Sequence, residues 1–203
     1  MIEPIVHRAR RPLAAAALAL LLQAATAQTD EAAAAFERED YATAAALYRP
    51  RAEAGSAEAQ YRMGLMLRFG WGVDKDAAAA AAMLRRAAEQ NHALAQAELG
   101  TMYRLGRGVP EDALEAARLL RSAAGAGVGI AQLSIGRMYR DGVGVAADPV
   151  EAYAWFQLAG ENGVMDGFAY RAELANSMTE AQLAAAKQRA AERAQVLRKE
   201  VPK

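Results

Sequence analysis

The sequence predicts an all-α protein, an α-solenoid of about four helix hairpins that repeat every 36 residues. Three observations predict this fold. Glycines recur at a fixed period, each period holds two segments with helical patterning, and alanine supplies much of an apolar fraction of 54%, while aromatic residues make up only 6%. Repeats of roughly 20 to 50 residues are typical of solenoids, and alanine-rich helices that pack closely are expected.

The glycines set the period, because Gly64, Gly100 and Gly136 lie 36 residues apart. Further columns have the same spacing: Gly70, Gly106 and Gly142; Gly72, Gly108 and Gly144; Gln60, Gln96 and Gln132; and Asp40, Asp76, Asp112 and Asp148. Agreement across this many columns excludes chance. One hairpin has too little apolar surface to be stable alone, so stacked copies are expected to share one continuous core.

The first helix of a period is expected at 57–69 in the first complete copy. Small residues at Ala59 and Gly64 permit a neighbouring helix to approach closely. Gly70 and Gly72 are expected to end the helix, since glycine tolerates the left-handed conformation found at helix C-termini.

The second helix is expected to begin after Asp76 and to run to about residue 90. An aspartate at this position can accept hydrogen bonds from the free N–H groups of the first turn. In the next two copies, Glu115 and Glu151 stand three residues after the corresponding aspartate, which predicts a capping box. Trp155 and Phe156, later in the same kind of helix, are expected in the core.

The two ends of the array, which spans 40–175, are expected to differ from its middle. Residues 28–39 form a predicted N-terminal capping segment, with a short helix at 30–38. Residues 176–203 form a predicted C-terminal capping helix and tail. Thr179 and Gln182 suggest a capping box that opens a polar helix from Glu180 to about Lys199.

The N-terminus, residues 1–27, has the pattern of a secretory signal peptide. Three arginines, Arg8, Arg10 and Arg11, precede a run of alanine and leucine at 13–22, and Ala25-Thr26-Ala27 supplies small residues for cleavage. Cleavage after Ala27 would leave Gln28 as the new N-terminus, and the protein is expected in the periplasm or outside the cell. An uncleaved anchor is the alternative, although the apolar run is short for a membrane span.

Composition excludes several kinds of chemistry. The chain has no cysteine, two histidines and a formal net charge of zero. Disulfides, thiolate metal sites and cysteine nucleophiles are therefore absent, and nothing indicates nucleic-acid binding, which requires a basic face. No cofactor, metal or catalytic residue is predicted. His92, in a turn after Asn91, is expected to be an ordinary surface residue.

The run Ala95-Gln96-Ala97-Glu98-Leu99-Gly100-Thr101-Met102-Tyr103, followed by Gly106-Arg107-Gly108-Val109-Pro110, resembles the Sel-one-like repeat family. Copies beginning at Ala59 and Ala131 also fit the pattern. The resemblance covers roughly residues 40 to 175. It implies a tetratricopeptide-like α-solenoid that serves as a protein-interaction scaffold and is not an enzyme. For exported bacterial members, it implies adaptors of the cell envelope.

Two features suggest where a partner binds. Arg68, Arg104 and Arg140 recur at the ends of successive first helices, and a row of guanidinium groups suits carboxylates or phosphates. The alternative is that each arginine only stabilises its helix C-terminus. Trp71 lies in a glycine-flanked loop where the repeat does not require an aromatic residue, so it is either an interaction anchor or a packing residue for the neighbouring hairpin.

Three functions follow from these features. The first is a periplasmic or secreted scaffold for a protein or peptide partner with acidic character. The second is a binder of an anionic envelope polymer such as peptidoglycan, and the third, less favoured, is a periplasmic hydrolase. Neither the identity of the partner nor the oligomeric state follows from the sequence.

Overall fold

A computed structural model describes residues 31–200, and side chains through 198. After a helical segment at 31–37, the helices follow in order: α2 (Tyr41–Glu53), α3 (Ala57–Phe69), α4 (Ala77–Glu89), α5 (Ala93–Leu105), α6 (Ala113–Gly125), α7 (Gly129–Asp141), α8 (Pro149–Glu161), α9 (Asp166–Ala175) and α10 (Glu180–Glu200). The predicted signal peptide, residues 1–27, lies outside the described residues.

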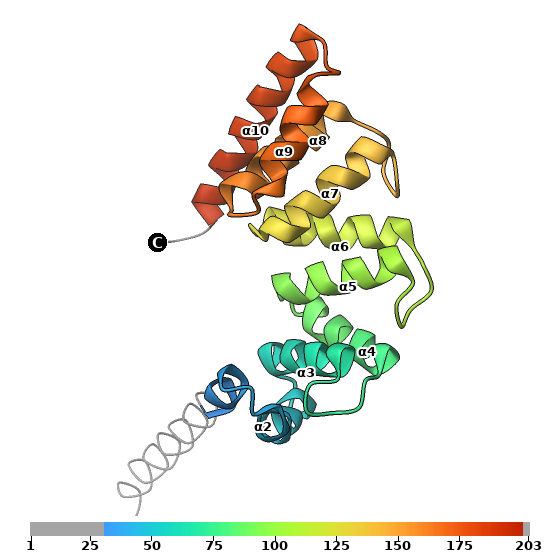
Figure 1. Ribbon diagram of the computed structural model, residues 1–203, viewed down its shortest axis with the longest axis vertical. Coiled ribbons are helices and arrows are strands. Elements are labelled where there is room, and N and C mark those ends of the chain that lie inside the picture. The colour runs from blue at the N-terminus through green and yellow to red at the C-terminus, as the bar shows by residue number, and fades with distance from the viewer. Residues whose placement is uncertain (1–30, 201–203) are drawn as a thin grey trace, which may run out of the picture.

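The helices stack in chain order into a curved array that runs from α2 at one end to α10 at the other (Figure 1). Helices α3 to α8 each pack on the helices before and after them in the chain, and α9 packs on α8. This arrangement confirms the predicted α-solenoid, with α3, α5, α7 and α9 as first helices and α4, α6 and α8 as second helices. Within 31–200, no helix combines the length and the apolar character that crossing a membrane requires.

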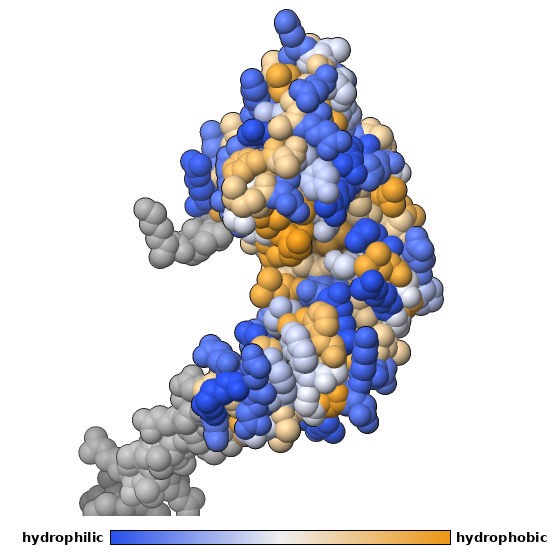
Figure 2. Space-filling model, in the orientation of Figure 1, coloured by the Kyte–Doolittle hydropathy of each residue, from blue (hydrophilic) through white to orange (hydrophobic). Residues whose placement is uncertain are grey.

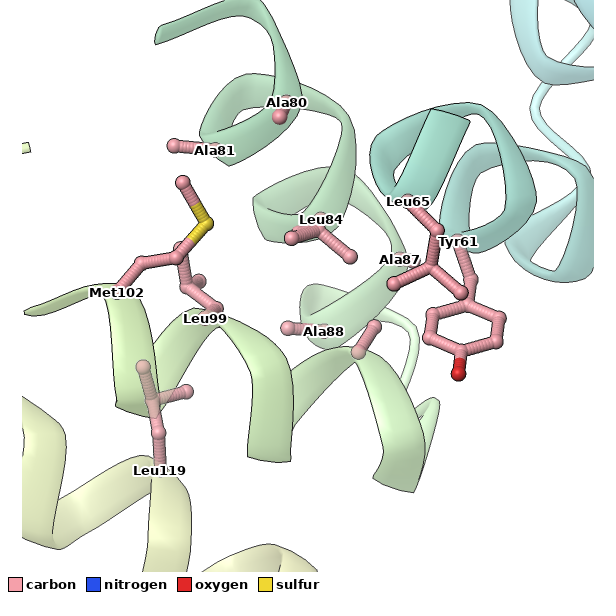
Figure 3. Packing of buried hydrophobic residues seen from close by; sticks show 11 residues of the cluster. Tyr61, Leu65, Ala80, Ala81, Leu84, Ala87, Ala88, Leu99, Met102 and Leu119 are labelled. Carbon is pink, nitrogen blue, oxygen red and sulfur yellow. The ribbon is translucent and has the colours of Figure 1, made fainter. Parts of the chain in front are cut away.

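A glycine column lets the two helices of each hairpin pack closely. A Cβ atom on Gly64 would lie 2.7 Å from Leu84, and one on Gly100 would lie 2.9 Å from Leu120. Leu84 is fully buried in a core shared by α3, α4 and α5 (Figure 3). The small residues expected from the sequence therefore bring each first helix against its second helix.

A second glycine column joins successive hairpins. Gly72, Gly108 and Gly144 have φ between 67° and 72°. A Cβ atom on any of them would collide with the backbone at the start of the preceding second helix, which is Tyr41, Ala77 or Ala113 respectively. Glycine is therefore needed at this column both for its backbone conformation and for space.

The aspartate column caps the second helices as predicted. The side chains of Asp76 and Asp112 accept hydrogen bonds from the backbone N–H three residues later, each at 2.9 Å. The reciprocal half of the predicted capping box is wrong. The N–H of Asp112 donates to the Tyr103 carbonyl at 3.0 Å, so Glu115 is free to bind Arg118.

A buried glutamine column links the repeats, a role that the sequence pattern alone did not reveal. Gln60, Gln96 and Gln132 lie in the core with at most 7% of their surface exposed. Each donates its amide N–H to a carbonyl near the end of the preceding second helix: Ala52, Ala88 and Ala124, at 3.1 to 3.2 Å. Each of these carbonyls also accepts a backbone N–H of the turn that follows the helix, so the glutamine adds a second hydrogen bond and ties each first helix to the end of the preceding helix.

The C-terminal helix α10 packs along α8. The predicted capping box at its start is present, because Thr179 and Gln182 exchange hydrogen bonds at 2.9 and 3.2 Å. Two of its arginines, Arg189 and Arg193, bind the carboxylate of Glu151, whose side chain is only 9% exposed. The second predicted capping-box glutamate thus anchors α10 instead.

Candidate partner-binding face

The side of α3, α5 and α7 that points away from the close-packing glycines is the candidate partner-binding surface. We call it the first-helix face. It contains four columns: Glu58, Leu94 and Ile130; Arg62, Glu98 and Ser134; Leu65, Thr101 and Arg137; and Phe69, Leu105 and Asp141. Leu65 itself is buried in the core, so in the first copy this column is not exposed. The steps of four, three and four residues place these positions on one side of a helix.

The predicted arginine row lies at the edge of this face, in the last turn of each first helix. Arg68 forms an ion pair with Glu98 on the next first helix, and its guanidinium lies 4.7 Å from the centre of the Phe69 ring. Burial is the main cause that lowers the pKa of Arg68, with a further contribution from the charge of Arg107. Arg68 is therefore already engaged.

Arg140, at the other end of the row, is also engaged. Its Nε and Nη2 atoms donate to the two carboxylate oxygens of Asp141 at 2.7 and 3.1 Å. These hydrogen bonds are the main cause that lowers the pKa of Asp141, against a smaller opposing effect of burial. The guanidinium also lies 5.4 Å from the ring centre of Tyr170 on α9.

Arg104, in the middle of the row, lines a pocket of about 200 Å³ between α5 and α7. The other lining residues are Ser134, Arg137, Met138, Asp141 and Val143. The Nε atom of Arg104 is buried without a hydrogen-bond partner, and no ion pair joins Arg104 to any residue described by the structure. The three arginines thus share a position but not an environment.

Arg137 is a basic residue of this pocket that the sequence analysis missed. Its Nη2 donates to the Tyr170 hydroxyl at 2.5 Å, and its guanidinium lies 4.5 Å from the centre of that ring. Superposing the copies could have found it, because the corresponding positions are Leu65 and Thr101, and only the third copy places a cation there.

Trp71 packs against an aromatic cluster. Its ring stacks on Phe69 at 4.7 Å and on Tyr41 at 5.4 Å, and it meets the edge of Phe36 at 5.7 Å, with all distances between ring centres. The indole is partly buried and contacts two of the core clusters. These contacts support the predicted packing role of Trp71. Binding of a partner by Trp71 stays a prediction. Trp155 and Phe156 lie in the core as predicted.

Trp71→Ala is expected to lower the free energy of unfolding by about 2 to 3 kcal/mol, somewhat less than the loss for a fully buried tryptophan. Urea denaturation followed by circular dichroism measures the loss. Trp71→Phe keeps an aromatic ring and should recover more than half of the stability. Wild-type stability in Trp71→Ala would contradict a packing role.

His92 is more than the surface residue that the sequence suggested. Its Nδ1 accepts the Ala95 N–H at 3.2 Å as the cap of α5, its Nε2 contacts Glu58 at 3.0 Å, and its ring stacks on Tyr61 at 4.7 Å. Burial would raise the pKa of Glu58, but hydrogen bonds from His92 and Arg62 outweigh it and lower this pKa below its ordinary value. These contacts of His92 join the start of α5 to α3.

The residues at 31–198 contain no group of histidines and acidic residues that could hold a metal ion. The pockets found there are open surface depressions, and the carboxylates at Glu58, Glu98, Asp141 and Glu151 are each paired with a cation.

The stacked hairpins define a helical-repeat protein, and the first-helix face runs along several of its repeats. The chain belongs to the Sel1 repeat family, whose repeat matches residues 57–92, 93–128 and 129–164. Proteins of this family generally act as protein-interaction scaffolds, and their fold is typically non-catalytic. Comparison with curated proteins gives no match.

Two solved structures are similar to this chain. A protective antigen of uropathogenic Escherichia coli with an SLR fold is 30% identical, with a TM-score of 0.71, over 79% of this chain and 36% of that protein. A Sel1 repeat protein from Oxalobacter formigenes is 28% identical, with a TM-score of 0.66, over 70% of this chain and 58% of its own. The chain thus spans between about a third and three fifths of these relatives.

Proposed function

We propose that this protein is an exported scaffold that holds a protein partner on the first-helix face. The observation that carries the proposal is the exposure of apolar side chains at equivalent positions of neighbouring helices. Leu94 is 45% exposed on α5, and Ile130 is 55% exposed at the same position of α7. Leu105 and Val143 are exposed near the ends of the same two helices.

Apolar side chains next to arginines have the composition of interaction surfaces, where apolar anchors and arginine are enriched. Figure 2 shows one side of the array, with hydrophobic residues gathered where it is hollowed midway along its length. Glycan recognition is less well supported, because Phe69 is the only exposed aromatic residue in the part that the structure describes. A protein segment is therefore the favoured ligand.

Site-specific photo-crosslinking in the native cell tests the proposal. A photoreactive amino acid at Leu94 or Ile130 is expected to capture a protein partner. Leu114, which is 74% exposed on the second helix α6, is the matched control and should capture none. Identical adducts from both faces, or no protein adduct from the first-helix face, would refute the proposal.

Periplasmic location is part of the proposal and rests on the N-terminal pattern of basic residues, an apolar run and small residues. The protein recovered from the periplasmic fraction is expected to begin at Gln28, which N-terminal sequencing would show. A cytoplasmic protein that retains Met1 would contradict export.

A further inference from the structure

We propose that the pocket between α5 and α7 binds the carboxylate of an acidic side chain, carried by an extended peptide segment of the partner. This inference rests on the proposed function and specifies the chemistry of the ligand. It replaces the predicted row of three equivalent arginines with one binding centre at Arg104 and Arg137.

The repeat itself shows what is missing from the pocket. At the junction of α3 and α5, Arg68 is neutralised by Glu98. At the next junction, the residue equivalent to Glu98 is Ser134, which has no charge. Arg104 therefore faces α7 without the carboxylate that its counterpart has, and its buried Nε atom lacks an acceptor. A buried donor without a partner is destabilising, so an arriving carboxylate would relieve this cost.

A second cation strengthens the site. Arg137 lines the same pocket, and its contacts in the described structure are to the neutral Tyr170 rather than to an ion-paired carboxylate. Tyr170 holds the guanidinium in place without forming an ion pair with it, although the charge of Arg137 contributes to the lowered pKa of Asp141. Two guanidinium groups on one pocket match the two oxygens of a carboxylate, because each presents planar N–H donors.

The acidic groups nearby do not cancel this charge. Asp141 lines the pocket, but Arg140 already binds both of its oxygens. The hydrogen bond to Asp141 is the main cause that raises the pKa of Arg140. Burial opposes it, and the charges of Asp141 and of Glu173 on α9 add smaller increases. Two cations and one anion line the pocket, which leaves a net positive charge there.

The surroundings favour an extended peptide as the source of the carboxylate. Met138 and Val143 supply apolar wall on one side of the pocket. The exposed Leu94 and Leu105 lie along the same helix as Arg104. A peptide that places an acidic side chain in the pocket would cover these neighbouring apolar side chains with its flanking residues, and such coverage excludes water from the charged pair.

Binding of short peptides to the full chain tests the inference. One library, blocked at both ends, has random flanking positions and a fixed central glutamate; the matched library has a central glutamine. The glutamate library is expected to bind about tenfold more tightly or better, because a carboxylate forms charge-assisted hydrogen bonds that an amide does not. Arg104→Gln and Arg137→Gln should each remove this preference.

Two variants use the repeat as its own control. Ser134→Glu rebuilds the Arg68–Glu98 pair at the second junction, so it should occupy the site from within and abolish the preference for glutamate in a folded protein. Glu98→Ser removes the pair at the first junction, where the residue equivalent to Arg137 is Thr101, so Arg68 alone should create no second site for glutamate. Circular dichroism checks that both variants fold.

Equal binding of the two libraries would overturn the carboxylate site, and so would a Ser134→Glu variant that binds as wild type. Binding of peptides with a free C-terminus and a central glutamine, with no binding of blocked glutamate peptides, would overturn the assignment to a side chain. None of these results affects the crosslinking test, so a scaffold that binds a non-acidic segment would remain distinguishable.

Discussion

Gly108→Ala is expected to lower the free energy of unfolding by about 2 to 5 kcal/mol. Two costs add. The left-handed conformation, with φ of 72°, costs an alanine about 1 to 2 kcal/mol. The new Cβ atom would also collide with the backbone carbonyl of Ala77, and overpacking typically costs about 1 to 3 kcal/mol. Because Ala77 begins the helix α4, its backbone cannot yield without moving that helix.

Gly127→Ala is the matched control. Gly127 also has a left-handed backbone, with φ of 87°, but nothing lies within 4 Å of the position that a Cβ would occupy. Its replacement should therefore show only the conformational cost of about 1 to 2 kcal/mol. Urea unfolding measures both variants, and equal losses would show that the close approach of Gly108 to α4 has no energetic weight.

The part of the chain that loses stability in Gly108→Ala gives a second readout. A repeat protein is stabilised by contacts between neighbouring copies, so a defect at one junction can unfold part of the array. Hydrogen exchange in Gly108→Ala should rise first in α4 and α5, on both sides of the altered junction. A uniform rise across the chain would instead indicate that the array unfolds as one unit.

The helices could be predicted from the sequence because their determinants are local. Glycine at a helix end and aspartate at a helix start act within a few residues. The first helix at 57–69 was therefore predicted with its correct bounds. The failed half of the capping boxes shows the limit of local reasoning, since the N–H of Asp112 is taken by a carbonyl of the preceding helix.

The candidate site could be predicted only in part, because its chemistry depends on pairs about 30 residues apart. The row of arginines follows from the period. In the structure, Arg68 pairs with Glu98 of the next copy, whereas Arg104 lies beside Ser134. These contacts depend on how far each side chain extends toward the next copy. Aligned columns contain this information, but only the packed array shows which columns touch.

The attachment of α10 is the other feature that the sequence did not predict. The sequence predicted a polar capping helix, yet its Arg189 and Arg193 both bind the buried Glu151. Arg193 also lies 4.1 Å from the ring centre of Trp155, which is 2% exposed. The polar side chains of α10 are therefore part of how the last hairpin is closed.

Replacing both arginines with alanine is expected to lower the free energy of unfolding by about 2 to 4 kcal/mol. Removing the partners of a fully buried charge costs about 3 to 5 kcal/mol. The value here is lower because the side chains of Arg189 and Arg193 are 45% and 30% exposed, and water partly replaces them. Hydrogen exchange in α10 should rise, and Trp155 fluorescence, read in a Trp71→Phe background, should become more accessible to quenchers.

Glu151 decides whether the loss comes from charge or from packing. If the uncompensated carboxylate causes the instability, adding Glu151→Leu to the double variant should restore part of the stability, because an apolar side chain of similar size has no buried charge to neutralise. Arg198→Ala, at an exposed position of the same helix, should change little. If Glu151→Leu restores nothing, the arginines hold α10 mainly through their contacts with Trp155 and their stems, and the ion pair contributes orientation rather than stability.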